Sequence, residues 1–299
     1  MKLYKYKAFG LHFTSTFEIP ELLLSDEEIT DVVIEMGEVP DELDNVLASG
    51  ARFQSNDNEF ILTVDTVARF YVKDGKKIIV AKNANAGDDE MRLFLLGSTL
   101  AALFYQRGLF PLHSSTVEIG NEAIAICGIS GVGKSTLAAS FMKSGKKLLA
   151  DDISVITFKE GKPYVNPSYP QMKLWADAVK YLGDHPGSYK KIRANIEKHG
   201  VQFHDSFLQD IRPLRHIFIL SIKNTEGIDM EDISGMDKFK VIQANTYRFG
   251  FMKSSEGRAG HLKQSSMLAS NVNITKIIRP RKGYFDKEII GFICKKLGK

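Results

Sequence analysis

The sequence predicts an α/β protein in which a P-loop core follows a mostly β N-terminal region. Residues 128–135 read Gly-Ile-Ser-Gly-Val-Gly-Lys-Ser, which fits the G-x-x-x-x-G-K-[ST] pattern of a phosphate-binding loop. A short apolar segment, 123–127, precedes this loop, and a segment of helical composition, 136–144, follows it. The start of the chain instead reads as short strands joined by turns. We therefore expect an N-terminal mostly β region over residues 1–86 and a P-loop domain over residues 87–299.

Two elements are expected in the residues before the P-loop core. Segments 67–72 and 77–81 are rich in β-formers and flank Asp74-Gly75, a dipeptide that supplies the positive φ angles of a tight hairpin turn. An apolar segment that ends near residue 107 follows the acidic run 88–90, and acidic residues favour a helix N-terminus. The pattern predicts a β hairpin and then a buried helix.

A second hairpin leads into the P-loop. Segments 112–119 and 122–127 are strand-like and are separated by Gly120-Asn121. If Ile119 faces Glu122, every pair of facing positions sums to 241, and His113 faces Gly128. We therefore expect the His113 imidazole to lie beside the start of the loop.

The residue types of the loop suit a nucleotide's phosphates. Glycines allow backbone N–H groups to close around phosphate oxygens, Lys134 supplies a positive charge, and the Ser135 hydroxyl can reach Mg²⁺. ATP and Mg²⁺ are therefore the expected cofactors, and the alternative is a chance glycine-rich turn between a strand and a helix. The candidate nucleotide-binding residues are Gly128, Ser130, Gly131, Val132, Gly133, Lys134, Ser135 and Thr136.

An acidic pair, Asp151-Asp152, follows the next short strand, residues 146–150. The pair begins 17 residues after Lys134, which leaves room for a helix and one strand, so the acids should emerge at the same sheet edge as the loop. One carboxylate there could hold a metal ion while the other accepts a proton from an attacking hydroxyl. The alternative is that both aspartates cap a turn.

Three features together resemble the HPr kinase/phosphorylase family, whose P-loop fold is shared with phosphoenolpyruvate carboxykinase. They are His113 on the strand before the P-loop strand, the run Ser-Gly-Val-Gly-Lys-Ser at 130–135, and Asp151-Asp152 after Leu-Leu-Ala. The resemblance covers residues 110–158 well. It implies a P-loop kinase core of this type, in which Asp151 is the general base that activates a serine hydroxyl and Asp152 helps to hold Mg²⁺.

The resemblance also implies that His113 lies against the acidic pair and the phosphates. The imidazole could then stabilise transferring charge or orient Asp151, whereas a lone histidine on a strand could also be simply packed. The family forms hexamers, so a homo-oligomer is one of the expected partner states.

The overall layout is more similar to HPr-kinase-like proteins of peptide-modification gene sets, because the Arg-Pro-Gly-Arg-Asn stretch of HPr kinases is absent. These proteins include kinases that phosphorylate the C-terminal serine of lasso-peptide precursors. The expected activity is thus ATP- and Mg²⁺-dependent transfer of the γ-phosphoryl group to a serine hydroxyl of a peptide or small protein. One alternative is a small-molecule kinase or an HPr-type kinase/phosphorylase. Another is a nucleotide-binding switch or scaffold, which would not need the acidic pair.

The C-terminal half supplies further elements and one more candidate residue. Segment 215–221 reads as a buried strand, 268–278 as a helix end running into another strand, and 283–297 as a helix. Arg248 is a candidate catalytic residue that could clamp phosphate or a peptide carboxylate.

The region between the acidic pair and that half is expected to hold a short helix and a loop. Trp175 should begin a helix over 174–182, with core packing favoured over a place in a pocket. The polar segment 185–204 should be a surface loop or a lid.

Composition excludes several classes of protein. Of the 299 residues, 43% are hydrophobic and 25% are charged, which excludes a disordered or fibrous chain. The longest uncharged apolar run, 93–106, has 14 residues, fewer than the ~20 that cross a bilayer, so no membrane partner is expected. The opening residues lack a signal-peptide core, and two cysteines are too few for a disulfide framework. We therefore expect a cytoplasmic protein.

The net charge of +4 hides an uneven distribution. Residues 1–100 carry a net charge of −8 and residues 243–299 a net charge of +9. Internal compensation between the two ends and a functional basic surface both remain open. No zinc-finger, RRM or basic-zipper pattern accompanies the basic end, so nucleic acid is not an expected partner.

Overall fold

The computed structural model describes residues 2–193, 196–251 and 255–299, which form two compact units. The first unit comprises Met1–Pro111 and Tyr247–Gln264, and the second comprises Leu112–Thr246 and Ser265–Lys299. The helical segment that follows the N-terminal strands therefore groups with those strands. The expected division after residue 86 stays a prediction.

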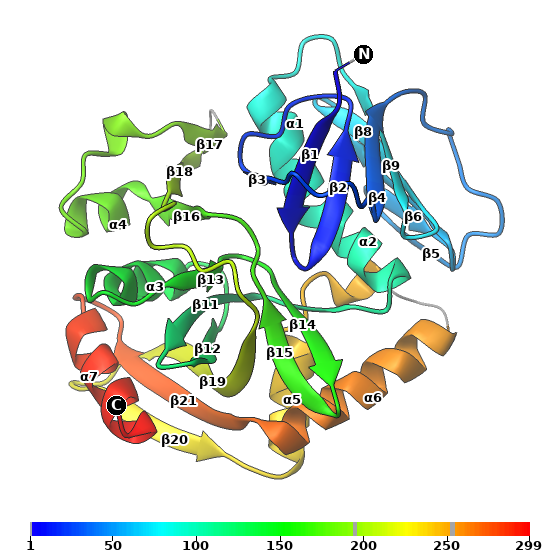
Figure 1. The fold of residues 1–299 in the computed structure, drawn as a ribbon. Coiled ribbons are helices and arrows are strands. Elements are labelled where there is room, and N and C mark those ends of the chain that lie inside the picture. Colours follow the sequence, from blue (N-terminus) through cyan, green and yellow to red (C-terminus); the bar gives the residue numbers. More distant parts are fainter. Residues whose placement is uncertain (1, 194–195, 252–254) are drawn as a thin grey trace. The chain divides into compact units, whose positions relative to one another are not determined.

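The first unit is built on one large sheet, as the strand-like start of the sequence predicts. Its strands follow the order β3-β1-β2-β4-β9-β8-β7-β6-β5 (Figure 1). They are β1 (Tyr4–Ala8), β2 (Leu11–Ser15), β3 (Leu23–Leu24), β4 (Val32–Met36), β5 (Ala48–Gly50), β6 (Phe53–Ser55), β7 (Glu59–Val64), β8 (Ala68–Lys73) and β9 (Lys77–Lys82).

Both elements predicted in this unit are confirmed. Strands β8 and β9 pair antiparallel around Asp74 and Gly75, whose φ angles of 53° and 61° are the positive values that the tight turn requires. The predicted helix is one helical stretch, α1 (Asp88–Phe94), a π-helical segment η1 (Leu95–Thr99) and α2 (Leu100–Gln106). The π-helical segment is buried along its whole length.

The second unit contains the P-loop in a mixed sheet with helices (Figure 1). Its order is β14-β15-β19-β12-β11-β13, and β21 and β20 extend from β19. The strands are β11 (Ser114–Ile119), β12 (Glu122–Cys127), β13 (Leu148–Ala150), β14 (Ser154–Lys159), β15 (Lys162–Asn166), β19 (Arg212–Lys223), β20 (Asp229–Ile233) and β21 (Asn273–Pro280). The described helices are α3 (Lys134–Lys143), α4 (Ala176–Tyr181), α5 (Met236–Ala244) and α7 (Asp286–Leu297), and α6 (Ser255–Asn271) runs across the division between the units. The short β10 (Phe110–Leu112) leads into β11, and two 3₁₀ turns are η2 (Pro186–Ser188) and η3 (Phe249–Phe251).

Strand directions bring the functional segments of this unit to one edge of the sheet. Strand β11 runs antiparallel to both of its neighbours, β12 and β13, so β12 and β13 run in the same direction. Their carboxyl ends, which lead into the P-loop and the acidic pair, therefore lie at the edge where β11 begins. The predicted hairpin register is confirmed, because Ile119 faces Glu122 and Ser114 faces Cys127.

A small separate sheet in the same unit corrects two expectations. It has the order β16-β18-β17, with β16 (Gln171–Trp175), β17 (Lys191–Arg193) and β18 (Ile196–Gln202). The segment 185–204 is therefore not simply a loop. The expected helix over 174–182 begins only at Ala176, because Leu174 and Trp175 pair with β18. Long-range strand pairing overrides local helical propensity here.

The expectations for the end of the chain are confirmed. Strand β19 contains the predicted segment 215–221, α6 runs into β21, and the final helix is α7. Within residues 2–193, 196–251 and 255–299, no helix has the length and apolar character that crossing a bilayer requires.

The close approach of β12 and β19 requires a glycine at position 128, the first glycine of the P-loop. At Gly128 the φ angle is 138°, and a Cβ placed there would lie 2.4 Å from the backbone oxygen of Leu220 on β19. Strands β12 and β19 pair in parallel up to Cys127, so the contact closes directly on the end of the ladder. Only glycine fits at this position without movement of β19.

We expect Gly128→Ala to lower the free energy of unfolding by about 2–5 kcal/mol, because overpacking against Leu220 adds to the cost of a positive φ angle. Gly131→Ala is the matched control, since its φ angle is also positive but its Cβ would meet nothing within 4 Å. It should cost only about 1–2 kcal/mol in a urea titration. Equal losses in the two variants would contradict the steric argument.

Candidate active site

The P-loop connects the end of β12 to the start of α3 in the conformation that its glycines predict. Gly128, Gly131 and Gly133 have φ angles of 138°, 83° and 105°, and Gly133 is the N-cap of α3. The Val132 carbonyl accepts a hydrogen bond of 3.0 Å from Nη2 of Arg279, which lies on β21 in the parallel part of the sheet. The loop is thus held from a second element while its helix N-terminus carries a partial positive charge.

The Lys134 side chain is folded back onto the loop. It is only 7% exposed, and its Nζ donates to the carbonyl oxygens of Gly128 at 2.9 Å and Ile129 at 3.3 Å. A third contact, of 3.1 Å, joins Nζ to Nε2 of His113. Burial lowers the pKa of the Lys134 ammonium. The loop therefore stabilises a buried cation with neutral acceptors.

His113 joins Lys134 to the acidic pair, at the position where the hairpin register predicted it. Its Nδ1 lies 2.9 Å from the Asp152 carbonyl oxygen, so Nδ1 carries the proton and donates it there. Nε2 then has a free lone pair for the Lys134 ammonium. Burial and the neighbouring Lys134 charge lower the pKa of His113, although Asp152 opposes them, so the imidazole is neutral at pH 7.

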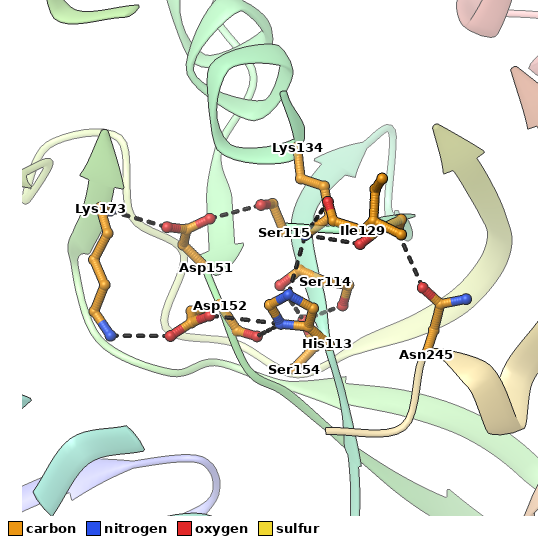
Figure 2. Close-up of polar contacts among 11 residues, drawn as sticks. His113, Ser114, Ser115, Ile129, Lys134, Asp151, Asp152, Ser154, Lys173 and Asn245 are labelled. Atoms are coloured by element: carbon orange, nitrogen blue, oxygen red, sulfur yellow. Dashed lines mark hydrogen bonds and ion pairs between the residues drawn. The ribbon is translucent and has the colours of Figure 1, made fainter. Parts of the chain in front are cut away.

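Asp151 is held by two donors from different strands (Figure 2). Its carboxylate accepts a hydrogen bond of 2.6 Å from the Ser115 hydroxyl on β11 and one of 3.0 Å from the Lys173 backbone N–H on β16. The residue is 4% exposed. These contacts set the plane of a carboxylate that still lines the cavity beside the loop.

Asp152 forms an ion pair with the same lysine. Its Oδ2 lies 2.9 Å from Nζ of Lys173, and its Oδ1 lies 3.5 Å from Nδ1 of His113. Its φ angle of 71° is unusual for a residue other than glycine. Burial would raise the pKa of Asp152, but the charge and hydrogen bond of Lys173 lower it to about 2. This carboxylate is ionised across the physiological range.

Asn245 occupies the place where the β11–β12 ladder would continue. Its Oδ1 accepts a hydrogen bond of 3.0 Å from the Gly128 N–H, and its backbone oxygen accepts one of 2.7 Å from the His113 N–H. Its own Nδ2 donates to the Val241 carbonyl in α5. Asn245 therefore separates the two strand ends and gives each a partner (Figure 2).

These residues surround a cavity of about 360 Å³ in the second unit. Most of the predicted site residues line it: His113, Ser130, Gly131, Gly133, Lys134, Ser135, Thr136, Asp151 and Asp152. The structure thus brings the loop, the histidine and the acidic pair together. Gly128 takes part through its carbonyl, and the Val132 side chain is buried while its carbonyl meets Arg279.

Arg248 is the predicted site residue that the structure does not bring to this cavity. It belongs to the first unit, and its guanidinium lies over the rings of Tyr247 and Phe251, at 5.7 and 5.9 Å from their centroids. Its catalytic role stays a prediction.

Several lining residues were missed by sequence reasoning. Lys173, Trp175 and Lys198 come from the small sheet, Arg279 lies on β21, and Arg281 directly follows that strand. The basic Arg-Pro-Arg-Lys run after a predicted strand was a usable signal for the arginines. The expectation of core packing for Trp175 is wrong, since the side chain is exposed on the cavity wall.

The oxygen-bearing side chains of the cavity decide whether it can hold a divalent cation. Within the described ranges, no three His, Cys, Asp or Glu side chains gather into a metal-binding cluster. Mg²⁺ in nucleotide sites typically uses one or two protein oxygens together with phosphate oxygens and water. Ser135 and Asp152, which line the same cavity, supply protein oxygens of that kind.

The sequence matches no family model and no curated protein. Among solved structures, one described as the Hpr(Ser) kinase/phosphatase from Coxiella burnetii is distantly similar. The two chains share 12% identity with a TM-score of 0.32, over 63% of this chain and 93% of that chain. A likeness at this level identifies neither an activity nor a substrate.

We expect Lys173→Met to raise the pKa of Asp152 above its value of about 2, because the largest favourable charge beside the carboxylate is removed. NMR titration of the Asp152 carboxyl carbon measures this shift, and Lys173→Arg should keep most of the depression. A depressed carboxyl pKa stabilises the fold above the unfolded-state pKa of about 4, and this contribution is lost as the pH falls toward 2. An unchanged Asp152 pKa in Lys173→Met would show that the ion pair is not its cause.

Proposed function

We propose that this chain is an ATP- and Mg²⁺-dependent kinase that transfers the γ-phosphoryl group to a serine hydroxyl of a peptide or small protein. The observation that carries the proposal is the meeting of a P-loop lysine and a doubly hydrogen-bonded, buried carboxylate at one cavity. A loop that only binds phosphate has no need of a carboxylate held in this way, so transfer is favoured over a nucleotide-binding switch or scaffold.

The residues present fit a triphosphate. The three positive-φ glycines and the N-terminus of α3 supply backbone N–H groups, and the Lys134 ammonium supplies charge. Its present acceptors are two carbonyls and a neutral imidazole, and phosphate oxygens would be stronger partners for a buried cation. Ser135 and Asp152 would hold Mg²⁺, which when bound neutralises charge on the β- and γ-phosphates.

The proposed reaction needs a base, and Asp151 supplies it. The acceptor hydroxyl gives its proton to the Asp151 carboxylate as its oxygen forms a bond to the γ-phosphorus. The bond between that phosphorus and the β,γ-bridging oxygen breaks, and ADP leaves with the electron pair. Asp152 is the weaker candidate for the base, because its ion pair with Lys173 holds the pKa at about 2.

His113, whose imidazole is neutral, and the charged Lys173 position the two acids. His113 connects the Asp152 carbonyl to the Lys134 ammonium, and Lys173 binds Asp151 through its backbone and Asp152 through its ammonium. A shift of either residue would move the base and the phosphate cradle relative to one another, and displacements of about 1 Å can cost a hundredfold in rate.

The proposed acceptor is a serine of a peptide. The sequence resemblance supports a peptide substrate with an acceptor serine, in particular the C-terminal serine of a lasso-peptide-type precursor. An HPr-type protein and a small molecule are the competing acceptors, and a homo-oligomer and a cytoplasmic location belong to the same proposal.

We expect Asp151→Asn to abolish phosphoryl transfer while ATP still binds, because the amide keeps the shape of the side chain but cannot take the proton. Intact-mass analysis after incubation with ATP and Mg²⁺ should show a gain of about 80 Da on a precursor peptide ending in serine, with wild type only. Asp237→Asn is the matched control, since Asp237 forms an exposed ion pair with Lys240 on α5.

Transfer to HPr or to a small molecule in place of the peptide would overturn the acceptor assignment. Nucleotide binding without transfer to any acceptor tested would overturn the kinase assignment in favour of the switch or scaffold. Full activity of Asp151→Asn would show that Asp151 is not the general base.

We expect Ser115→Ala to lower kcat about tenfold or more with little change in the KM for ATP, because the Asp151 carboxylate loses one of its two orienting donors. Ser114→Ala is the control, since the Ser114 hydroxyl donates to the Ser154 hydroxyl rather than to an acid. Steady-state kinetics of both variants make the comparison. An equal loss of kcat in the two variants would indicate that both substitutions disturb the packing at the start of β11 and that the effect is not specific to Asp151.

A further inference from the structure

An exposed aromatic surface in the P-loop cavity belongs to Trp175, the single tryptophan of the chain. Its side chain is 42% exposed although it ends a strand in the second unit's small sheet. A tryptophan that leaves so much surface in a cavity beside a P-loop is suited to a planar ligand.

Strand register places this ring in a row with two lysines. Lys173 and Trp175 are two residues apart on β16, so they share a face and lie about 7 Å apart. Trp175 faces Lys198 across the β16–β18 pair, and Lys198 Nζ lies 5.2 Å from the indole centroid. Since Lys173 binds Asp152, the row runs from the acidic pair to an aromatic surface.

The neighbouring elements show which part of a ligand would reach the ring. Strand β16 packs against α3, whose first residues, Ser135, Thr136 and Leu137, line the same cavity. The first turn of that helix is where a P-loop holds the phosphates nearest the sugar. A nucleotide bound there continues through its ribose to its base, which is the planar part.

The cavity wall also contains aromatic and acidic groups. Tyr284 is 51% exposed there and stacks on Tyr181 of α4 at a centroid distance of 3.7 Å and an interplanar angle of 5°. The Tyr181 hydroxyl donates to Asp286, and Asp177 also lines the cavity. Carboxylates in this wall can accept a hydrogen bond from the amino group of a base.

From these contacts we infer that Trp175 is the stacking platform for the base of the nucleotide whose phosphates bind the P-loop. The inference rests on the proposed function, because it requires a nucleotide in the loop. Base–aromatic stacking is sequence-tolerant and sizeable, so its loss should weaken nucleotide binding roughly 10- to 100-fold.

The test compares two probes, Mg²⁺·ATP and inorganic tripolyphosphate with Mg²⁺, which has the phosphates but no base. Isothermal titration of the full chain should show that Trp175→Ala weakens ATP binding roughly 10- to 100-fold and leaves tripolyphosphate binding unchanged. Trp175→Phe should retain most of the ATP affinity, and this variant guards against a folding defect in Trp175→Ala. In the wild type, ATP should change the tryptophan fluorescence, whose only source is Trp175, more than tripolyphosphate does.

Equal loss of both probes in Trp175→Ala, or no loss of either, would overturn the inference. An unchanged affinity for ATP with a raised KM for the acceptor would also overturn it and place the acceptor on the ring. If tripolyphosphate binds the wild type but the Trp175 fluorescence and the Trp175→Ala substitution show no effect specific to ATP, only the assignment of Trp175 to the nucleobase is wrong. If neither probe binds the wild type, the proposed function fails together with it.

Discussion

A chain of hydrogen bonds from the Asp152 carbonyl through His113 to the Lys134 ammonium is the contact on which the rest of this site depends. A buried cation needs acceptors, and the neutral imidazole can be one only because its other nitrogen donates to a backbone carbonyl. The carbonyl belongs to the acidic pair at the end of β13, and the cation belongs to the loop at the end of β12. The His113 side chain, which directly precedes β11, therefore sets the distance between the P-loop and the acidic pair.

The small sheet supplies the opposite wall of the same cavity. Lys173 contacts both acids, one through its backbone and one through its side chain, so the position of β16 determines the orientation of both carboxylates. The strand then continues to Trp175 at the cavity surface. We thus propose that one strand, β16, both orients the two carboxylates and contacts the nucleobase. The position of the nucleobase would then be coupled to that of the two acids.

Local sequence signals were sufficient where neighbours in the chain make the structure. The hairpin before the P-loop follows from Gly120-Asn121, and its register alone predicts that His113 lies beside Gly128. Contacts between distant segments had no such signal: Asn245 binds Gly128 across 117 positions, and Lys173 binds Asp151 across 22. The neighbours of Trp175 favour a helix, and its pairing with Lys198 makes it a strand residue. Arg248 had the chemistry for phosphate but belongs to the other compact unit.

The central claim is that this sheet edge binds the phosphates of a nucleotide, and a crystal structure with Mg²⁺ and a non-hydrolysable ATP analogue tests it most directly. We expect the backbone of residues 131–135 to enclose the triphosphate and Lys134 to turn from the Gly128 and Ile129 carbonyls to the phosphate oxygens. We also expect Mg²⁺ beside Ser135 and Asp152. A triphosphate bound elsewhere, or Lys134 still on its own loop at saturating nucleotide, would contradict it.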